Sequence, residues 1–320
     1  MSAPIISLST SYLQPKFKDD GYAMLAEAAE MGFEYVELGH STPVTAVDGI
    51  LRALGDGVVK VSSLHNFCPL PPYVKGSAPN LYSPATRSLR ESEQWLRHTK
   101  NTMLFAQTTG ARAVVCHAGR IKKFLFQPES AIFSYRDRLD DGFELDALAD
   151  DKKYLKIRDR FLRRMRGLTQ KGYANIVENF KRLYAEIPEA QRAVACGIEN
   201  REDPQDLPAD WDFEEFAKLV LEVPQAGLWH DVGHSKKKEQ LQLGRQLDLI
   251  ERTADRIIGW HLHDCSKSGR DHIAIGRGDI DFKPISKFFD PQRHIFTLEI
   301  NSSVAREDVE DSLSRVRDMF

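Results

Sequence analysis

The stretch Gly227-Leu-Trp-His-Asp-Val-Gly-His234 carries the clearest structural signal in this 320-residue chain. It starts as a short apolar run and closes with Asp231 and, three residues later, His234. If the run from Ala226 is a buried strand, Asp231 lies at its carboxyl end and the Val-Gly pair turns His234 back toward the same point. A carboxylate and an imidazole at one point are typical metal ligands. The stretch therefore predicts a strand end that contributes to a metal site.

Seven further apolar segments of similar length are spread along the chain, and most of them also close with a polar or ionisable residue. Continuous runs rich in Val, Ile and Leu are typical of strands that are buried on both faces, as in parallel sheets. With the segment 226–234, they predict eight strands. The seven segments span residues 4–10, 33–39, 58–66, 111–119, 195–201, 257–264 and 294–301.

Helix-like stretches alternate with these segments, which predicts the α/β class and, with eight alternations, a (β/α)8 TIM barrel. An open doubly wound sheet is disfavoured because no phosphate-cradling glycine loop follows the first segment. Gly32, Gly110 and Gly227 are expected to end helices that lead into strands. The helix-like stretches span residues 21–31, 83–109, 171–187, 213–221, 243–253 and 304–319.

One segment is too long for an ordinary loop of such a barrel. Residues from about 121 to 168 form an insertion after the fourth strand, acidic in its first half and basic in its second. We expect two solvated helical faces that pair with each other, and the alternative is an arm that binds a polyanion. The insertion leaves the catalytic side of the barrel, so it could form a lid or a subunit contact. The chain is expected to be a single TIM-barrel domain over residues 1–320.

The composition narrows the choice of partners. A net charge of -3 argues against a general electrostatic grip on nucleic acid or anionic membranes. Four cysteines lie far apart and form no CxxC, which disfavours a disulfide framework or a structural zinc knuckle. The chain begins without a signal-peptide pattern and has no run of about 20 apolar residues. We therefore expect a cytoplasmic protein with a small-molecule substrate and no membrane partner.

The polar residues that close the predicted strands are the candidate functional residues. In a parallel barrel the carboxyl ends of all strands meet at one mouth, so these side chains should converge. Strand alternation also places His261 and His263 on one face. The candidates are His65, His117, Glu199, Asp231, His234, His261, His263, Glu299 and, in the seventh loop, His272.

Each of these residues alone is explained by an ordinary structural role. A single histidine at a strand end is often a hydrogen-bonded loop anchor, and a single glutamate often a salt-bridge partner. Many imidazoles and carboxylates at one mouth are costly to desolvate unless a cation neutralises them. The absence of thiolates favours Zn²⁺ or Mn²⁺, with Mg²⁺ or Co²⁺ as further options.

Three smaller features carry weaker expectations. Glu37 closes the second strand and faces the same mouth, either supporting the site or serving the structure. The segment Gly276-Arg-Gly-Asp-Ile-Asp-Phe282 is expected to be a turn with Asp281 as the N-cap of the next helix, and the alternative is an anion-binding glycine turn. Cys116 and Cys265 flank candidate ligands, but strand alternation turns them away from the site.

Taken together, these residues resemble the xylose isomerase-like TIM-barrel superfamily. This group includes sugar-phosphate isomerases and epimerases, ketose 3-epimerases, inosose dehydratases and the endonuclease IV group. The matching pieces follow the family order over essentially the whole chain apart from the insertion. They are Ile-Glu-Asn at Glu199, Asp-x-x-His at Asp231 and His234, His-Leu-x-Asp at His261 and Asp264, Asp-His followed by Ile-Gly-x-Gly at Asp271 and His272, and Leu-Glu at Glu299.

The resemblance implies a shared metal with His234 beside it. In the epimerase branch His234 would contact the substrate, whereas in the endonuclease branch it would bind a further metal together with His65, His117 and His272. This chain departs from the endonuclease pattern in one place, because Arg270 stands where that branch has an aspartate. The implied ligands of the shared metal are Glu199, Asp231, His261 and Glu299.

Two catalytic functions are compatible with these residues. The first is an isomerase or epimerase of a sugar or sugar phosphate, in which Glu199 and Glu299 move a proton through an ene-diolate. The second is a multinuclear phosphodiester hydrolase of the endonuclease IV type. The charge balance favours the sugar because DNA binding depends on phosphate neutralisation. A barrel that only binds a ligand is the third alternative, and the oligomeric state, including a homo-oligomer, is left open.

Overall fold

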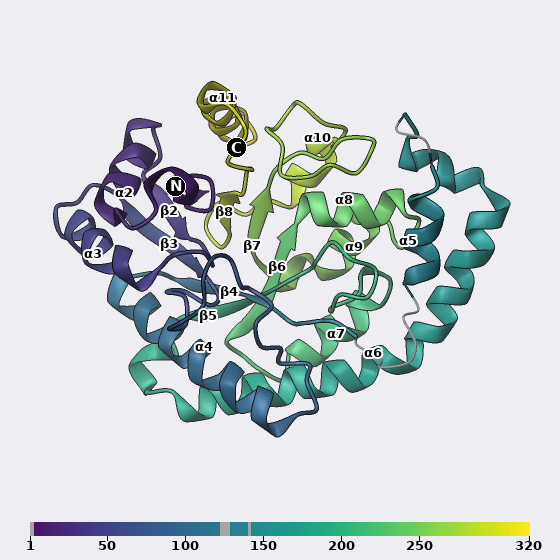
Figure 1. Cartoon of the computed structure of the whole chain (residues 1–320), viewed down its shortest axis with the longest axis horizontal. Helices are drawn as coiled ribbons and strands as arrows, with labels where there is room; N and C mark the ends of the chain where they lie inside the picture. Colours follow the sequence, from purple (N-terminus) through teal and green to yellow (C-terminus); the bar gives the residue numbers. More distant parts are fainter. Residues whose placement is uncertain (1–2, 122–128, 140–141) are drawn as a thin grey trace.

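The computed structural model describes residues 3–121, 129–139 and 142–320, and its centre is a closed parallel barrel (Figure 1). Each strand pairs with the next in sequence, and β8 pairs with β1. This confirms the predicted (β/α)8 TIM barrel. The strands are β1 (Ile5–Ser9), β2 (Tyr35–Leu38), β3 (Lys60–His65), β4 (Ala113–His117), β5 (Ala195–Glu199), β6 (Ala226–Asp231), β7 (Ile257–Leu262) and β8 (Ile295–Leu298).

Helices surround the barrel, as Figure 1 shows. Local signals explain some of their ends: Ser88 accepts a hydrogen bond from the backbone of Glu91 at the start of α4, and Gly110 ends α4 with φ of 74°. The helices are α1 (Gln14–Phe17), α2 (Gly21–Glu30), α3 (Val47–Gly55), α4 (Leu89–Thr109), α5 (Ser130–Arg136), α6 (Lys152–Glu186), α7 (Phe213–Val220), α8 (Val232–Gln240), α9 (Gln246–Thr253), α10 (Phe282–Ile285) and α11 (Arg306–Arg317).

Two local expectations around strand β6 are wrong. Val232 and Gly233 open α8 instead of forming a turn, and the Asp231 carboxylate caps this helix by accepting from the backbone N–H of His234 at 2.7 Å. Gly227 lies within β6 and ends no helix. A Cβ on Gly227 would lie 2.6 Å from Cγ2 of Ile258, so this glycine permits close packing against β7.

The insertion is held by apolar packing. Its basic half is the start of α6, which begins 19 residues before the expected residue 171 because Asp151 caps it there, accepting from the backbone of Lys153 and Tyr154. Asp140 and Asp141 of the acidic half lie outside the described residues. A second core forms where α5, α6 and the segment after α8 meet. Its buried members are Ile132, Leu145, Leu148, Tyr154, Phe161, Met165, Leu241 and Leu243.

Trp229 fills the inside of the barrel below the mouth. It is fully buried and packs with Ala113, Val115 and Ile295 from other strands. The two strands beside it carry glycine at the contact: a Cβ on Gly197 would lie 2.7 Å from the Trp229 ring, and one on Gly259 would lie 2.2 Å from it. The indole therefore has its space because both neighbours lack a side chain.

We predict that Gly259→Ala destabilises the protein because the new methyl group would overlap the Trp229 ring inside a closed barrel. The expected loss is about 1–3 kcal/mol of unfolding free energy, measured by urea denaturation. Gly167→Ala is the control, since Gly167 lies in α6 with nothing within 4 Å of a new Cβ. That change should stabilise by about 0.5–1 kcal/mol. Equal effects of the two substitutions would contradict this account of the barrel interior.

Two buried histidines pack against Trp260. The Trp260 indole N–H and the backbone N–H of Asp290 both donate to Nδ1 of His294 at 3.0 Å. His230 packs against the Trp260 ring as well, with 5.2 Å between the ring centroids. Burial lowers the pKa of both imidazoles from 6.5 to about 4. Protonation of Nδ1 of His294 would break both hydrogen bonds.

The His294 contacts predict a loss of stability in acid. Because its folded pKa lies below the unfolded value, the unfolded state binds more protons, and its contribution is lost as pH falls from about 6.5 toward 4. The stability advantage of wild type over His294→Gln should therefore shrink across this interval. Thermal unfolding of both proteins at closely spaced pH values measures it. An advantage that stays constant with pH would exclude His294 as the titrating group.

None of the described helices combines the length and the apolar character that crossing a lipid bilayer requires.

Candidate active site

The barrel brings the predicted site residues to one mouth. Each lies at or just after the carboxyl end of a strand, except His234, which lies in the first turn of α8, and His272, which lies in the loop after β7. Their side chains are buried, with His272 only partly so. The strand-end residues are His65 of β3, His117 of β4, Glu199 of β5, Asp231 of β6, His261 and His263 of β7, and Glu299 of β8.

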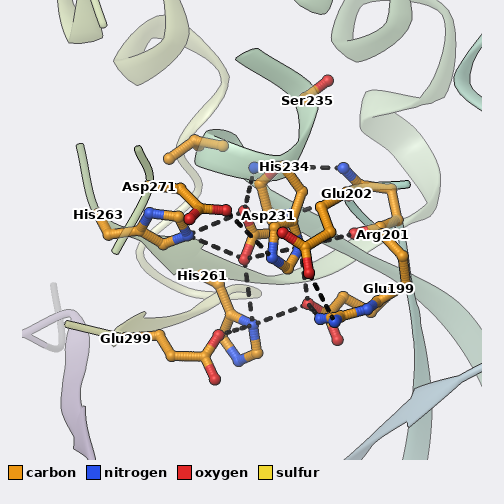
Figure 2. Close-up of polar contacts among 12 residues, drawn as sticks. Glu199, Arg201, Glu202, Asp231, His234, Ser235, His261, His263, Asp271 and Glu299 are labelled. Carbon is orange, nitrogen blue, oxygen red and sulfur yellow. Dashed lines mark hydrogen bonds and ion pairs between the residues drawn. The ribbon is translucent and has the colours of Figure 1, made fainter. Parts of the chain in front are cut away.

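Three carboxylates gather around one imidazole at the centre of this mouth (Figure 2). Nδ1 of His261 lies 2.9 Å from Oε2 of Glu299, 3.4 Å from Oε1 of Glu199 and 3.7 Å from Oδ2 of Asp231. One ligand atom from each of the four residues lies within 4.8 Å of the others. The four residues implied by the family resemblance therefore lie close enough to share one ion.

Glu199 faces a second group of imidazoles with its other oxygen. Its Oε2 atom lies 3.0 Å from Nε2 of His117 and 3.3 Å from Nε2 of His65. The ring of His40 packs on His65 with 4.6 Å between centroids. The two oxygens of this carboxylate are thus directed to two different sets of ligand atoms. Such an arrangement can bridge two ions.

The other histidines of the mouth differ in how their nitrogens are used. His263 has both committed, because Nε2 lies 3.0 Å from Oδ1 of Asp231 while Nδ1 accepts from the backbone N–H of His272. His234 uses only Nδ1, which lies 3.3 Å from both Glu199 and Asp231. His263 therefore orients Asp231, and His234 keeps Nε2 for another partner.

The charges of the mouth depend strongly on one another. Burial raises the pKa of Glu199, but Arg201 and His117 outweigh it and hold this pKa well below its ordinary value. Burial lowers the pKa of His234, yet Asp231 and Glu199 raise it to about 9. His261 has a pKa well above its ordinary value, since the nearby carboxylates overcome its burial. The carboxylates thus draw positive charge into the site.

One buried imidazole nitrogen at the mouth, Nε2 of His234, has no hydrogen-bond partner among the described residues. A buried polar atom without a partner costs free energy, so this nitrogen is available to a ligand. The potential metal ligands at the mouth are imidazole nitrogens and carboxylate oxygens, which suit a divalent ion such as Zn²⁺ or Mn²⁺. The residues present therefore fit a metal.

Four residues of the mouth are not among the candidates predicted from the sequence. His40 lies two residues after the end of β2, so the same rule about polar residues at strand ends could have found it. Arg201 approaches Oε1 of Glu199 with its Nη1 atom at 3.4 Å. Glu202 and Lys237 enter from the loop after β5 and from α8. Only the fold places these last three, because their positions in the sequence are ordinary for surface charges.

Asp264 binds the glycine turn and is not part of the central group of ligands. The carboxylate of Asp264 accepts from the backbone N–H groups of Gly276 and Gly278, each at 2.9 Å. The turn therefore does bind an anion, but the anion is a side chain of the same protein. Asp281 caps α10 as expected, accepting from the backbone of Lys283 at 3.1 Å.

Glu37 supports the central imidazole from the side opposite to the other carboxylates. Its oxygens lie 3.1 and 3.4 Å from Nε2 of His261, and Ser63 donates its hydroxyl to Oε2 of Glu37 at 2.8 Å. Glu37 is completely buried. A carboxylate on the far nitrogen of a ligating histidine fixes its tautomer and increases its basicity. Glu37 thus turns Nδ1 of His261 toward Glu199 and Glu299.

Fold and site together define a TIM-barrel protein with a carboxylate and histidine centre at the carboxyl ends of its strands. The chain belongs to the family of xylose isomerase-like TIM barrels, whose family model matches residues 25–319. This confirms the resemblance seen in the sequence motifs. No curated protein matches the chain by sequence.

Solved structures share the fold over nearly the whole chain. The 3-keto-D-glucoside 4-epimerase from E. coli is 14% identical, with a TM-score of 0.62 over 98% of this chain and 99% of that one. The D-psicose 3-epimerase from Clostridium cellulolyticum, solved with D-tagatose, is 11% identical, with a TM-score of 0.65 over 98% and 99%. An AP endonuclease of family 2 from Brucella melitensis is 16% identical, with a TM-score of 0.59 over 98% of both chains. At these identities the likeness concerns the fold.

We predict that Glu37→Gln weakens metal binding, because His261 would lose the carboxylate that orients it. The affinity for Zn²⁺ or Mn²⁺ should fall by about 10- to 100-fold, measured by competition with a chromophoric chelator. Glu34→Gln is the control, since Glu34 pairs with Lys60 on the surface. The same affinity in both variants would show that Glu37 does not support the centre.

Proposed function

We propose that this protein is a divalent-metal-dependent isomerase or epimerase of a sugar or sugar phosphate. The observation that carries the proposal is the pair of carboxylates on one imidazole: Glu199 from β5 and Glu299 from β8 both face Nδ1 of His261. Proton transfer at a carbon beside a carbonyl needs two such groups, one to accept the proton and one to return it. Carboxylates from different strands can reach different faces of a bound sugar.

The charges of the mouth suit this chemistry. A divalent ion held by Glu199, Asp231, His261 and Glu299 would polarise the carbonyl and make the neighbouring C–H more acidic. The pKa of Glu299 is well below its ordinary value because His261 and His272 outweigh the effect of burial. Glu299 is therefore ionised at neutral pH and can accept a proton. His234 offers its unpartnered Nε2 to a substrate oxygen.

Structural neighbours agree with a sugar substrate. Two of them are a 3-keto-D-glucoside 4-epimerase and a D-psicose 3-epimerase solved with D-tagatose. A net charge of -3 also suits a small substrate better than a long polyanion. These points support a sugar or sugar phosphate as the substrate.

A second candidate is a multinuclear phosphodiester hydrolase, and one observation favours it. Oε2 of Glu199 faces His65 and His117 while Oε1 faces His261, so this carboxylate could join two ions. Two ions about 3.5–4 Å apart can activate water and stabilise a leaving oxygen. An AP endonuclease of family 2 is among the structural neighbours. The number of bound ions separates this candidate from the first.

Metal content tests the proposed centre. Wild-type protein dialysed against metal-free buffer should retain Zn²⁺ or Mn²⁺, and Glu199→Gln and Asp231→Asn should lose most of it, because each removes a charged ligand. Elemental analysis of the purified proteins gives the stoichiometry. One ion per chain supports the isomerase, whereas two or three favour the hydrolase. Unchanged content in both variants would exclude these ligands.

Isotope exchange tests the reaction. In D₂O the wild type should introduce deuterium at a carbon next to the carbonyl of a ketose or ketose phosphate, detected by NMR. Glu299→Gln should slow this exchange by about 100-fold or more because it removes a proton acceptor. Hydrolysis of abasic-site DNA without any exchange would overturn the isomerase in favour of the second candidate.

A further inference from the structure

Three consecutive lysines of α8 reach three different places. Lys236 pairs with Asp279 at 3.4 Å, and Lys238 is buried against Asp210 at 2.8 Å. Lys237, between them, turns toward the mouth of the barrel. A run of lysines is usually a solvated surface, but here each ammonium has its own carboxylate. Of the three, Lys237 lies at the candidate active site.

A group of three potential ligands lies beside the central one. Glu202 follows β5, His234 belongs to the first turn of α8 and Asp271 lies in the loop after β7, and their ligand atoms all lie within 4.8 Å of one another. His234 is completely buried, and its Nε2 atom has no hydrogen-bond partner among the described residues. This atom lies 4.0 Å from Oδ2 of Asp271. One imidazole and two carboxylates are a typical set for a divalent ion.

Lys237 forms ion pairs with both carboxylates of this group. Its Nζ atom is 2.5 Å from Oε2 of Glu202 and 3.1 Å from Oδ2 of Asp271. Lys237 follows His234 by three residues on α8, so the helix brings both side chains to the same face. An ammonium that is covalently attached to the protein therefore already lies between the two carboxylates of the group.

We propose that the ammonium of Lys237 is a built-in cation that closes the group of Glu202, His234 and Asp271 to a divalent ion. An ion at ordinary bond lengths of about 2 Å from these carboxylates would lie within about 5 Å of the ammonium. Charges of +2 and +1 at that distance repel strongly where side chains are mostly shielded from water. The proposal rests on the proposed metal-dependent function. It states that the central group binds an ion and that the neighbouring group of Glu202, His234 and Asp271 does not.

A second group of potential metal ligands on this side of the mouth also cannot bind an ion. It consists of His234, His263 and His272. His263 cannot offer a lone pair to an ion, since Nδ1 already accepts from the backbone of His272 and Nε2 donates to Asp231. With Lys237 in place, Nε2 of His234 is therefore left to bind a substrate oxygen and no metal.

Replacing the lysine should open the site. Lys237→Met keeps the length of the apolar part of the side chain and removes the charged amino group. Wild type, Lys237→Met and two controls are stripped with a chelator, reloaded with Zn²⁺ or Mn²⁺, dialysed and analysed for metal per chain. We expect one additional ion per chain in Lys237→Met. The controls, Lys237→Arg and the neighbouring Lys236→Met, should match the wild type, and adding Glu202→Gln to Lys237→Met should remove the additional ion.

The outcomes separate this proposal from the proposed function. A wild type without metal would defeat the proposed function, while the difference between Lys237→Met and wild type still tests the role of Lys237. A folded Lys237→Met protein with the wild-type stoichiometry would overturn the proposal. An additional ion in Lys236→Met as well would also overturn it, because any loss of charge would then suffice. Circular dichroism verifies folding, and Lys237→Gln replaces Lys237→Met if the latter does not fold.

Discussion

The mouth of this barrel depends on one electrostatic constraint, which is the crowding of buried carboxylates around His261. Glu199, Asp231 and Glu299 each place an oxygen within 3.7 Å of Nδ1 of that imidazole. Removed from water, these negative charges must be balanced. The protein balances them with imidazoles raised in pKa and with Arg201 beside Glu199. A catalytic metal would complete a charge balance that the side chains begin.

The rest of the fold holds these charges at fixed distances. Eight paired strands bring residues that are far apart in the sequence to one level, and Trp229 fills the barrel below them because Gly197 and Gly259 leave it space. The Trp229 ring also packs against His261, with 5.5 Å between the centroids. Glu37 supports the other edge of that imidazole. Packing therefore supports the candidate active site from beneath, through Trp229 and Glu37.

Much of this arrangement could be predicted from the chain. The apolar runs located all eight strands, and the residues that close them proved to converge, since parallel strands of a barrel end at one mouth. Prediction was weaker where helix signals compete. The pair Val232-Gly233 suggested a turn but starts α8, because the Asp231 carboxylate caps that helix. The basic half of the insertion is helical, as expected, but it continues without a break into the helix expected from residue 171, and together they form α6.

The sequence by itself determined the barrel, the strand ends and the ligand types, because apolar runs and the residues that close them are local properties of the chain. Only the tertiary structure decided which atoms of these residues contact which partners. It directs the two oxygens of Glu199 to different imidazoles, uses both nitrogens of His263, and lays Lys237 across Glu202 and Asp271. These relations depend on distances between side chains from different strands and loops, which linear spacing does not encode.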